Sequence, residues 1–166
     1  MEMSSKPDYG LAATGQPVHA ATIGVADLAR SAGLYCDQMG LDVLEQRRMS
    51  GRGFEAHWGL PAGSTATLAV LGEPRFAVGR LALIEFAAPG RQVVREVEWQ
   101  SIYGLVNLNF YSDDIFVHTR RLEAAGCRAW SEPQVHDMGA MGQPIEVMLD
   151  GPDGVVINLI ELRGEP

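Results

Sequence analysis

Apolar residues along the chain follow two different periods, and the changes between them divide the first half into elements. The run from Val18 to Val25 is rich in β-branched and small residues, which is typical of a strand. Apolar residues then recur at helical spacing, with Asp27 placed to cap a helix and Gly40 to end it. Residues 50–64 are rich in glycine and are predicted to form a loop. Three further strands are predicted at residues 41–49, 65–72 and 79–86.

The second half repeats this order of one strand, one helix and three strands. Asp114 follows Asp27 by 87 residues, and Glu161 follows Glu85 by 76 residues, each at a matching place in the pattern. We therefore predict an α+β fold in which two tandem βαβββ modules form one globular domain. The predicted parts are a flexible N-terminal extension at 1–16, a first module at 17–88, a connector at 89–103 and a second module at 104–163.

Composition and charge narrow the class of protein. Hydrophobic residues make up 46% of the 166 residues, enough for a sizeable core, and no apolar run approaches the roughly 18 residues that span a membrane. The net charge of −8 argues against a nucleic-acid partner, and the pairs Arg47–Arg48 and Arg120–Arg121 are predicted to be solvated. Cys36 and Cys127 match no zinc pattern, which favours reduced thiols in a cytoplasmic protein.

Three stretches together carry a resemblance to a known family. They are VADLARSAGLYCDQMGLDV, then SDD with its following helix and AAGCRAW, and finally DGPDGVVINLIEL. In this order, within paired βαβββ modules, they resemble the vicinal oxygen chelate superfamily, which includes glyoxalase I, extradiol dioxygenases and the bleomycin-resistance proteins. The resemblance covers residues 17–163. It implies that the mixed sheets curl into a cup that holds the functional site, and that the protein forms a homodimer.

The resemblance also identifies four strand positions at which metal-using members carry His or Glu ligands. In this chain they hold Ala20, Ala82, Asn107 and Asn158. Alanine has no donor atom and an asparagine carbonyl is a weak, neutral one, whereas divalent transition metals favour imidazole, carboxylate or thiolate. We therefore expect a lost metal site and no cofactor. The alternative is a divalent metal whose ligands are shifted by one residue, with a β-bulge bringing His19 into place.

Alternation along the strands predicts which side chains face the cup. Asn107, Asn109 and Asn158 share the cup face, and Thr22 joins them from the first module. Buried amides need hydrogen-bond partners, which either a polar ligand or the amides themselves would supply. The same alternation turns the glutamates of the two final strands, Glu85 and Glu161, toward the opposite face, where they are predicted to cap or pair near the helices.

An apolar wall for the cup is predicted from large, adaptable side chains. Trp58 and Met148 are the main candidates, and core packing explains them equally well. Further candidates for the same wall are Met138, Met141 and Trp130.

Two classes of function fit these residues. The first is a protein that binds a small organic molecule without chemistry, as the bleomycin-resistance relatives do; the acidic charge would suit a cationic ligand. The second is an enzyme, either a metal-independent isomerase, lyase or cyclase or a metal-dependent lyase or dioxygenase. The strand positions supply no titratable group, so His57 or His136 would act as the general base. A histidine over the pocket would favour the enzyme, and an all-amide pocket the binder. A third possibility is an assembly surface.

Overall fold

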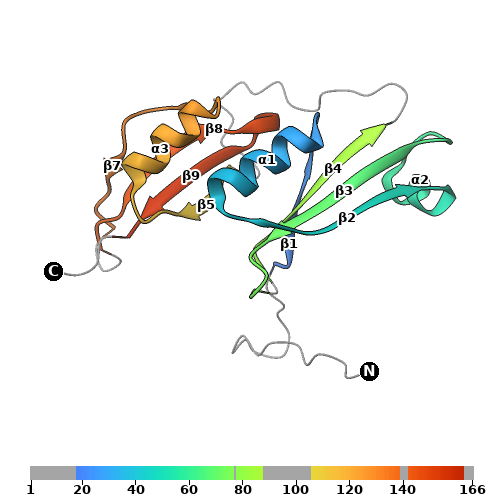
Figure 1. The fold of residues 1–166 in the computed structure, drawn as a ribbon, viewed down its shortest axis with the longest axis horizontal. Coiled ribbons are helices and arrows are strands. Elements are labelled where there is room, and N and C mark those ends of the chain that lie inside the picture. Colours follow the sequence, from blue (N-terminus) through green and yellow to red (C-terminus); the bar gives the residue numbers. More distant parts are fainter. Residues whose placement is uncertain (1–17, 77, 88–105, 139–141, 163–166) are drawn as a thin grey trace. The chain divides into compact units, whose positions relative to one another are not determined.

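The computed structural model describes residues 18–76, 78–87, 106–138 and 142–162 of the chain, drawn in colour in Figure 1. Contacts divide these residues into two compact units on either side of the segment between residues 87 and 106, with residues 37–39 grouped in the second unit. Each unit contains a mixed sheet. The predicted α+β class and the tandem modules are therefore confirmed.

The first unit contains a four-stranded sheet in the order β1-β4-β3-β2. β1 runs parallel to β4, and the other neighbours are antiparallel. Buried residues on one face of this sheet include Leu71, Leu81 and Leu83. The elements are β1 (Ala20–Gly24), α1 (Leu28–Met39), β2 (Asp42–Ser50), α2 (Arg52–Trp58), β3 (Thr65–Gly72) and β4 (Arg80–Ala87).

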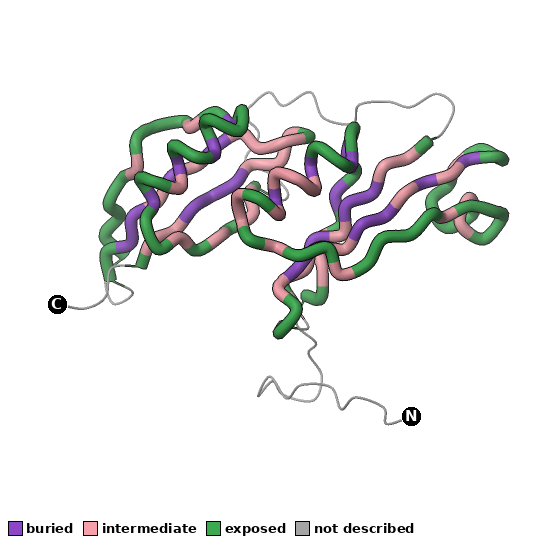
Figure 2. Tube along the Cα trace, viewed as in Figure 1, coloured by how far each residue is buried: buried purple, intermediate pink, exposed green. Residues whose placement is uncertain are grey.

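The second unit contains a sheet in the order β5-β9-β8-β6, and β7 also pairs with β8. The helix α3 lies against β6, β8 and β9, and their buried residues are coloured purple in Figure 2. Alternating burial along β8 shows that one face of the strand packs into the core. The elements are β5 (Leu108–Tyr111), α3 (Ile115–Ala124), β6 (Arg128–Ala129), β7 (Gln134–Val135), β8 (Ile145–Asp150) and β9 (Val156–Glu161), with a short 3-10 turn at Pro152–Gly154.

Both helices that follow a first strand begin in the same way. The Asp27 carboxylate accepts a hydrogen bond from the backbone N–H of Arg30 at 3.0 Å, and Glu85 of β4 accepts one from the N–H of Leu28 at 2.8 Å. These carboxylates satisfy donors that a helix N-terminus leaves free. The second module has the same pair of bonds, from Val117 N–H to Asp114 at 2.9 Å and from Ile115 N–H to Glu161 at 2.8 Å. The predicted capping role of both glutamates is confirmed.

Strand register confirms the internal repeat. Thr22 of β1 lies beside Ala82 of β4, and Asn109 of β5 lies beside Asn158 of β9. Asn109 follows Thr22 by 87 residues and Asn158 follows Ala82 by 76, which are the two offsets predicted from the aspartates and glutamates. Equivalent positions in the two modules can therefore be compared directly.

The predicted glycine-rich loop at 50–64 was wrong, because residues 52–58 form the helix α2. Gly51 and Gly59 have positive φ angles and place the helix between two sharp turns. The many glycines of residues 50–64 led to the prediction of a loop. The helix between them is short, and its Phe54 and Trp58 lie on one face. The sequence CRAWSEPQVHDM, residues 127–138, also predicts a single strand, and this prediction is wrong. The segment is divided into β6 and β7, and Pro133 between them cannot donate a ladder hydrogen bond.

The remaining general expectations concern the cysteines and membrane spans. Cys36 is partly buried, Cys127 is buried, and neither forms a disulfide, as predicted. None of the helices in the described part of the chain is long and apolar enough to cross a membrane.

Candidate functional site

The first module contains a cavity of about 610 Å³. Its floor comes from β1, β3 and β4, and its walls come from β2 and α2, so the helix that the sequence did not predict forms one side. The lining residues are Thr22, Arg47, Arg48, Met49, Ser50, Phe54, His57, Trp58, Leu68, Ala82 and Ile84. The volume is within the range of cavities that hold small organic ligands.

The floor of this cavity is apolar. Leu68 and Ile84 pair across β3 and β4 and form a buried cluster with Ala66. Ala82, which occupies one of the four predicted metal-ligand positions, lines the cavity beside Thr22. A side chain without donor or acceptor atoms thus forms this part of the floor.

Aromatic rings close the side formed by α2. The Trp58 ring meets the Phe86 ring edge to face, with 5.2 Å between centroids, and the Phe54 ring stacks against Phe86 at 6.3 Å. His57 contacts Trp58 with 5.4 Å between ring centroids and also lines the cavity. Trp58 keeps 40% of its surface exposed, so its ring is available to a ligand. The sequence predicted Trp58 and His57 in a loop, and the structure places them on the helix α2, where both line the cavity.

Every polar side chain of the described lining can donate a hydrogen bond, and the two arginines can only donate. These side chains are Arg47, Arg48, Ser50, Thr22 and His57, and no carboxylate belongs to the described lining. Arg47 forms an ion pair with Glu45 at 3.2 Å, and both side chains are at least half exposed. Arg47 and Arg48 are exposed, as predicted. The sequence pattern did not show that β2, the edge strand that carries both arginines, borders a cavity.

The open face of the sheet in the second module is polar at the matching place. Asn158 is 4% exposed and donates its two Nδ2 hydrogens to Asn109 Oδ1 at 3.1 Å and to Glu146 Oε2 at 2.9 Å. Asn107 Nδ2 also donates to Asn109 Oδ1, at 3.0 Å. The three asparagines therefore share one face, as alternation predicted, and they bond to one another. Asn158 Oδ1 is buried and has no hydrogen-bond partner among the described residues.

Glu146 is the functional candidate that the sequence analysis missed. It lies on β8, half-buried, on the same face as Asn158, so the expectation that the strands supply no titratable group was wrong. The signal was present in IEVMLD, residues 145–150, where apolar and polar residues alternate strictly. Register then places Met148 opposite Asn158 and Glu146 opposite Ile160. The predicted wall residue Met148 is thus next to the amide network.

Other predicted site residues lie elsewhere. Ala20 begins β1, and the pairing of β1 with β4 runs without a shift from Ala20 to Gly24, so the bulge imagined for His19 is absent from that segment. His136 is exposed, and its backbone N–H donates to the Pro144 carbonyl at 2.9 Å. Met138 is 43% exposed, and residue 141 lies outside the described residues.

Trp130 has a structural partner. Its indole Nε1–H donates to Asp150 Oδ1 at 2.7 Å, and Arg128 donates to Oδ2 of the same carboxylate at 2.7 Å and 2.9 Å. Burial alone would raise the pKa of Asp150, but the hydrogen bonds from Trp130 and Arg128 and the charge of Arg128 outweigh it and lower that pKa. The cluster joins β6 to the end of β8.

The four family metal positions do not match the chemistry of a divalent transition-metal site. Ala20 and Ala82 offer no ligand atom, and the bonding hydrogens of Asn158 point toward Glu146 and Asn109. Within the described residues, no three side chains of the His, Cys, Asp or Glu type are grouped closely enough to hold a metal ion. The donor set differs from the imidazole and carboxylate set that such metals favour.

Comparisons with solved structures support the fold. A glyoxalase family protein from Bacillus cereus matches with a TM-score of 0.76 and 20% identity, over 93% of this chain and 99% of that one. Trypanothione-dependent glyoxalase I from Leishmania major matches with a TM-score of 0.57 and 19% identity, over 89% and 87% of the two chains. Glyoxalase I from Zea mays matches at 0.55 and 18%, over 90% of this chain but 46% of that one.

Comparisons of sequence identify the family. No curated protein matches the chain. The family described as the Glyoxalase/Bleomycin resistance protein/Dioxygenase superfamily matches over residues 16–159, which is most of the chain. Together with the paired βαβββ modules, this match shows that the chain belongs to the glyoxalase/bleomycin resistance protein/dioxygenase superfamily.

Proposed function

We propose that this protein binds a small organic molecule in the cavity of its first module, without a resident metal. The ligand has an apolar body and a group that accepts hydrogen bonds, such as a carboxylate. The observation that carries the proposal is the cavity itself, because an apolar floor of Leu68, Ala82 and Ile84 lies beneath a rim of donors. Apolar cavities of this size with a few convergent polar groups are typical of ligand sites.

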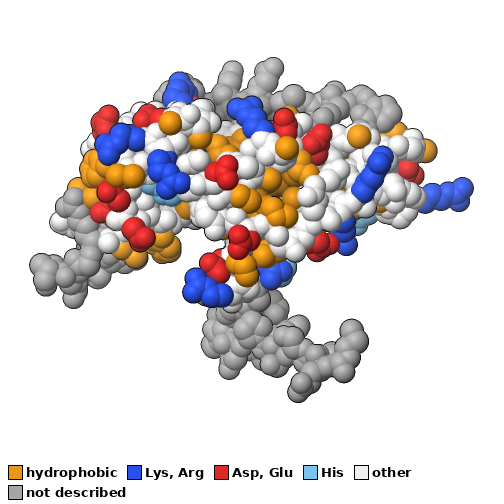
Figure 3. All heavy atoms as spheres, in the orientation of Figure 1, with side chains coloured by type: hydrophobic (Ala, Val, Ile, Leu, Met, Phe, Trp, Pro, Cys, Tyr) orange, Lys and Arg blue, Asp and Glu red, His pale blue; other side chains and the backbone are white. Residues whose placement is uncertain are grey.

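The local charge of the cavity outweighs the overall charge in this argument. The whole chain carries a net charge of −8, which in itself would favour a cation. Figure 3 shows acidic and basic side chains interspersed over the visible face, with apolar side chains between them. Two arginines and no carboxylate belong to the described lining residues, and Glu45 offsets the charge of Arg47 alone by pairing with it at 3.2 Å. Contacts within a few ångströms matter more than distant charges that salt screens.

A binding experiment with matched probes tests the proposal. We expect 3-phenylpropionate to raise the melting temperature by about 2–5 °C at millimolar concentration. Ala82→Phe fills the cavity with a ring and should abolish this shift. Val117→Phe adds the same ring at an exposed position of α3 and should leave the shift unchanged. No stabilisation of the parent protein, or equal stabilisation of Ala82→Phe, would overturn the proposal.

The metal-free part has its own measurement. After incubation with Zn, Fe(II), Mn and Ni salts and desalting, we expect metal content well below one equivalent per chain, because the four positions lack suitable donors. Near-stoichiometric retention of any one metal would contradict the absence of a resident metal. It would not affect the ligand cavity, which the melting-temperature experiment tests separately.

An enzyme is the second candidate, and His57 is the observation that favours it. Its side chain lines the cavity, as a general base would require, and this is the feature expected to distinguish an enzyme from a binder. No residue in the described segments hydrogen-bonds to the His57 ring to orient it, which is why binding is preferred. Incubation of bound probes in D₂O tests the alternative: deuterium uptake that is lost in His57→Gln would establish acid–base chemistry.

We infer that the protein is a homodimer in the cytoplasm. The family resemblance supports the dimer, and the two cysteines, which form no disulfide, support the location. Sedimentation equilibrium of the full chain at micromolar concentration tests the homodimer, and the expected mass is twice 18.0 kDa.

A further inference from the structure

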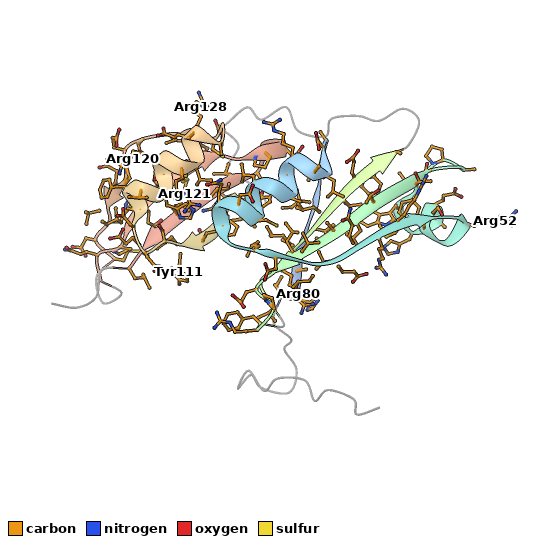
Figure 4. All side chains as sticks on the ribbon, viewed as in Figure 1. Arg52, Arg80, Tyr111, Arg120, Arg121 and Arg128 are labelled. Carbon is orange, nitrogen blue, oxygen red and sulfur yellow. The ribbon has the colours of Figure 1, made fainter. Side chains whose placement is uncertain are left out.

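The open face of the second sheet presents six side chains in two parallel rows. One row runs from Glu146 through Ile160 to Tyr111, across β8, β9 and β5. The next row runs from Met148 through Asn158 to Asn109. Adjacent strands lie about 4.8 Å apart, so each row places its outer side chains roughly 10 Å from one another. Figure 4 labels Tyr111 on β5, where 75% of its surface is exposed.

The first module shows what this surface is like without polar groups. Its equivalent rows hold Leu68, Ile84 and Gly24, and then Val70, Ala82 and Thr22. Leu68 stands where the second module has Glu146, and Ala82 stands where it has Asn158. The fold therefore accepts apolar residues at these positions. A carboxylate and two amides in the second module have to be explained by something other than the requirements of the fold.

Glu146 has no counter-charge among the described residues. Its carboxylate is half-buried and accepts a hydrogen bond from the neutral Asn158 amide. None of the ion pairs found among the described residues involves it. Partly burying a carboxylate is costly unless a cation or several donors compensate for the lost water. The missing compensation points to a positively charged group outside the described residues.

Asn158 holds this carboxylate in place and leaves an acceptor of its own unsatisfied. Both of its Nδ2 hydrogens are used, which fixes the amide orientation, because the reverse orientation would set its oxygen against Glu146 and Asn109 oxygens. Its Oδ1 is buried without a partner among the described residues, in a side chain that is 4% exposed. An unpaired buried acceptor is destabilising, so the fold keeps Asn158 in this orientation at a cost.

The chemistry of these acceptors selects an organic cation over a metal ion. Hard cations such as Ca²⁺ require six to eight oxygens, and this face offers one carboxylate with amide oxygens of which Asn109 Oδ1 already accepts two bonds. Apolar side chains also lie near Glu146, because Ile160 and Met148 are its neighbours and Tyr111 stands at the other end of its row. The Tyr111 ring, roughly 10 Å from Glu146, would contact the apolar body of a ligand whose charged group binds Glu146.

We propose that this face is a second recognition site, for a primary ammonium or amidinium group carried on an apolar or aromatic body. Glu146 accepts the charged hydrogen bonds, Asn158 is a positioning residue, and Ile160, Met148 and Tyr111 contact the body. Its residues are distinct from those that line the cavity of the first module, and its ligand has the opposite charge.

A crossed experiment tests this site. 3-Phenylpropylammonium should raise the melting temperature and shift the side-chain amide resonances of Asn158 and Asn109 in a saturable way. Glu146→Gln, which keeps the shape, should weaken Kd on the order of ten-fold. Glu146→Leu introduces the residue type found at the equivalent position, Leu68, so the protein should still fold. This variant should also weaken binding of the ammonium probe. Ala82→Phe should leave ammonium binding unchanged, and Glu146→Gln should leave 3-phenylpropionate binding unchanged.

Three results would overturn the inference. They are an absence of saturable amide shifts with the ammonium probe, equal binding by Glu146→Gln, and amide shifts produced by 3-phenylpropionate with the same affinity. Saturation of the same resonances by CaCl₂ or ZnCl₂ alone would also overturn it, by assigning the face to a metal. Because each probe has its own disabling variant, failure here is distinguishable from failure of the cavity proposal.

Discussion

At the scale of single residues, the difference between an amide and a carboxylate decides what the second module can do. Asn158 occupies a position where metal-using relatives are expected to carry glutamate, and its amide donates to Glu146. A carboxylate there would have no hydrogens to donate. The amide therefore holds the neighbouring carboxylate in place by a hydrogen bond, whereas two carboxylates at this distance would repel each other unless a cation lay between them.

Asn158→Asp tests this argument. It places a second carboxylate at the 2.9 Å contact with Glu146, so we expect it to lower the free energy of unfolding by about 1–3 kcal/mol at pH 7. Asn158→Ala, which copies Ala82, also removes the unpaired Oδ1 and should cost less. Urea melts at pH 7 and pH 4.5 check both, and the gap between the variants should narrow at the lower pH. Parent-like stability of Asn158→Asp at pH 7 would refute the charge argument.

Strand alternation accounts for what the sequence predicted correctly at this scale. It placed the three asparagines on one face and the two glutamates on the other, because side-chain direction in a strand depends only on parity. The same alternation applies to Glu146, but this residue lies at none of the four positions that the family resemblance indicates. Alternation did not reveal that Arg47 borders a cavity, since that depends on which strand lies at the sheet edge.

At the scale of elements, the glutamates that cap the helices link each first helix to the last strand of its own sheet. Glu85→Ala and Glu161→Ala should each lower the free energy of unfolding by about 1–2 kcal/mol, because a helix N-terminus loses an acceptor and a favourable charge. The Gln variants keep an oxygen and should lose about half as much. Denaturant melts give the values.

The control for capping is Glu123→Ala, an exposed glutamate near the C-terminal end of α3, where a negative charge has no favourable interaction with the helix dipole. We expect it to be neutral or slightly stabilising. Losses of similar size at Glu123 and Glu161 would mean that the effect is general charge removal and not capping.

The link between β6 and β8 gives a pH-dependent prediction. The folded protein lowers the pKa of Asp150 below its ordinary value of about 3.8, so ionised Asp150 stabilises the fold above that pH. This contribution is lost as the pH falls through the folded-state pKa. Asp150→Asn should therefore be less stable than the parent at pH 7, and the difference should shrink between pH 5 and pH 3. Urea melts across this range check it, and a constant difference would exclude the carboxylate charge as the cause.

The elements also show where pattern reading fails. The predicted helices at 27–40 and 112–126 have capping residues and long apolar periods, and both are present as α1 and α3. The helix α2 spans seven residues between positive-φ glycines, too few for a periodic signal. Its stability comes from tertiary packing of Phe54 and Trp58 against Phe86, which a local pattern does not contain.

At the scale of the whole molecule, one fold has been used twice with different surface chemistry. The buried faces of the two sheets are alike, with Leu83 and Leu159 at equivalent positions and both fully buried. The open faces have diverged to a donor-lined cavity in one module and an acceptor-rich surface in the other. Conserving the buried face keeps the fold, while the open face is free to change its ligand.

Separate cores predict separate responses to damage. Leu83→Ala and Leu159→Ala remove the same side chain from equivalent, fully buried sites, and each should cost about 2–5 kcal/mol. Because contacts divide the chain into two compact units, we expect Leu83→Ala to speed native-state amide hydrogen exchange in β3 and β4 more than in β8 and β9. Leu159→Ala should show the reverse. If either variant instead speeds exchange equally in both sheets, the two modules open as a single cooperative unit, and ligand binding to one would stabilise the other.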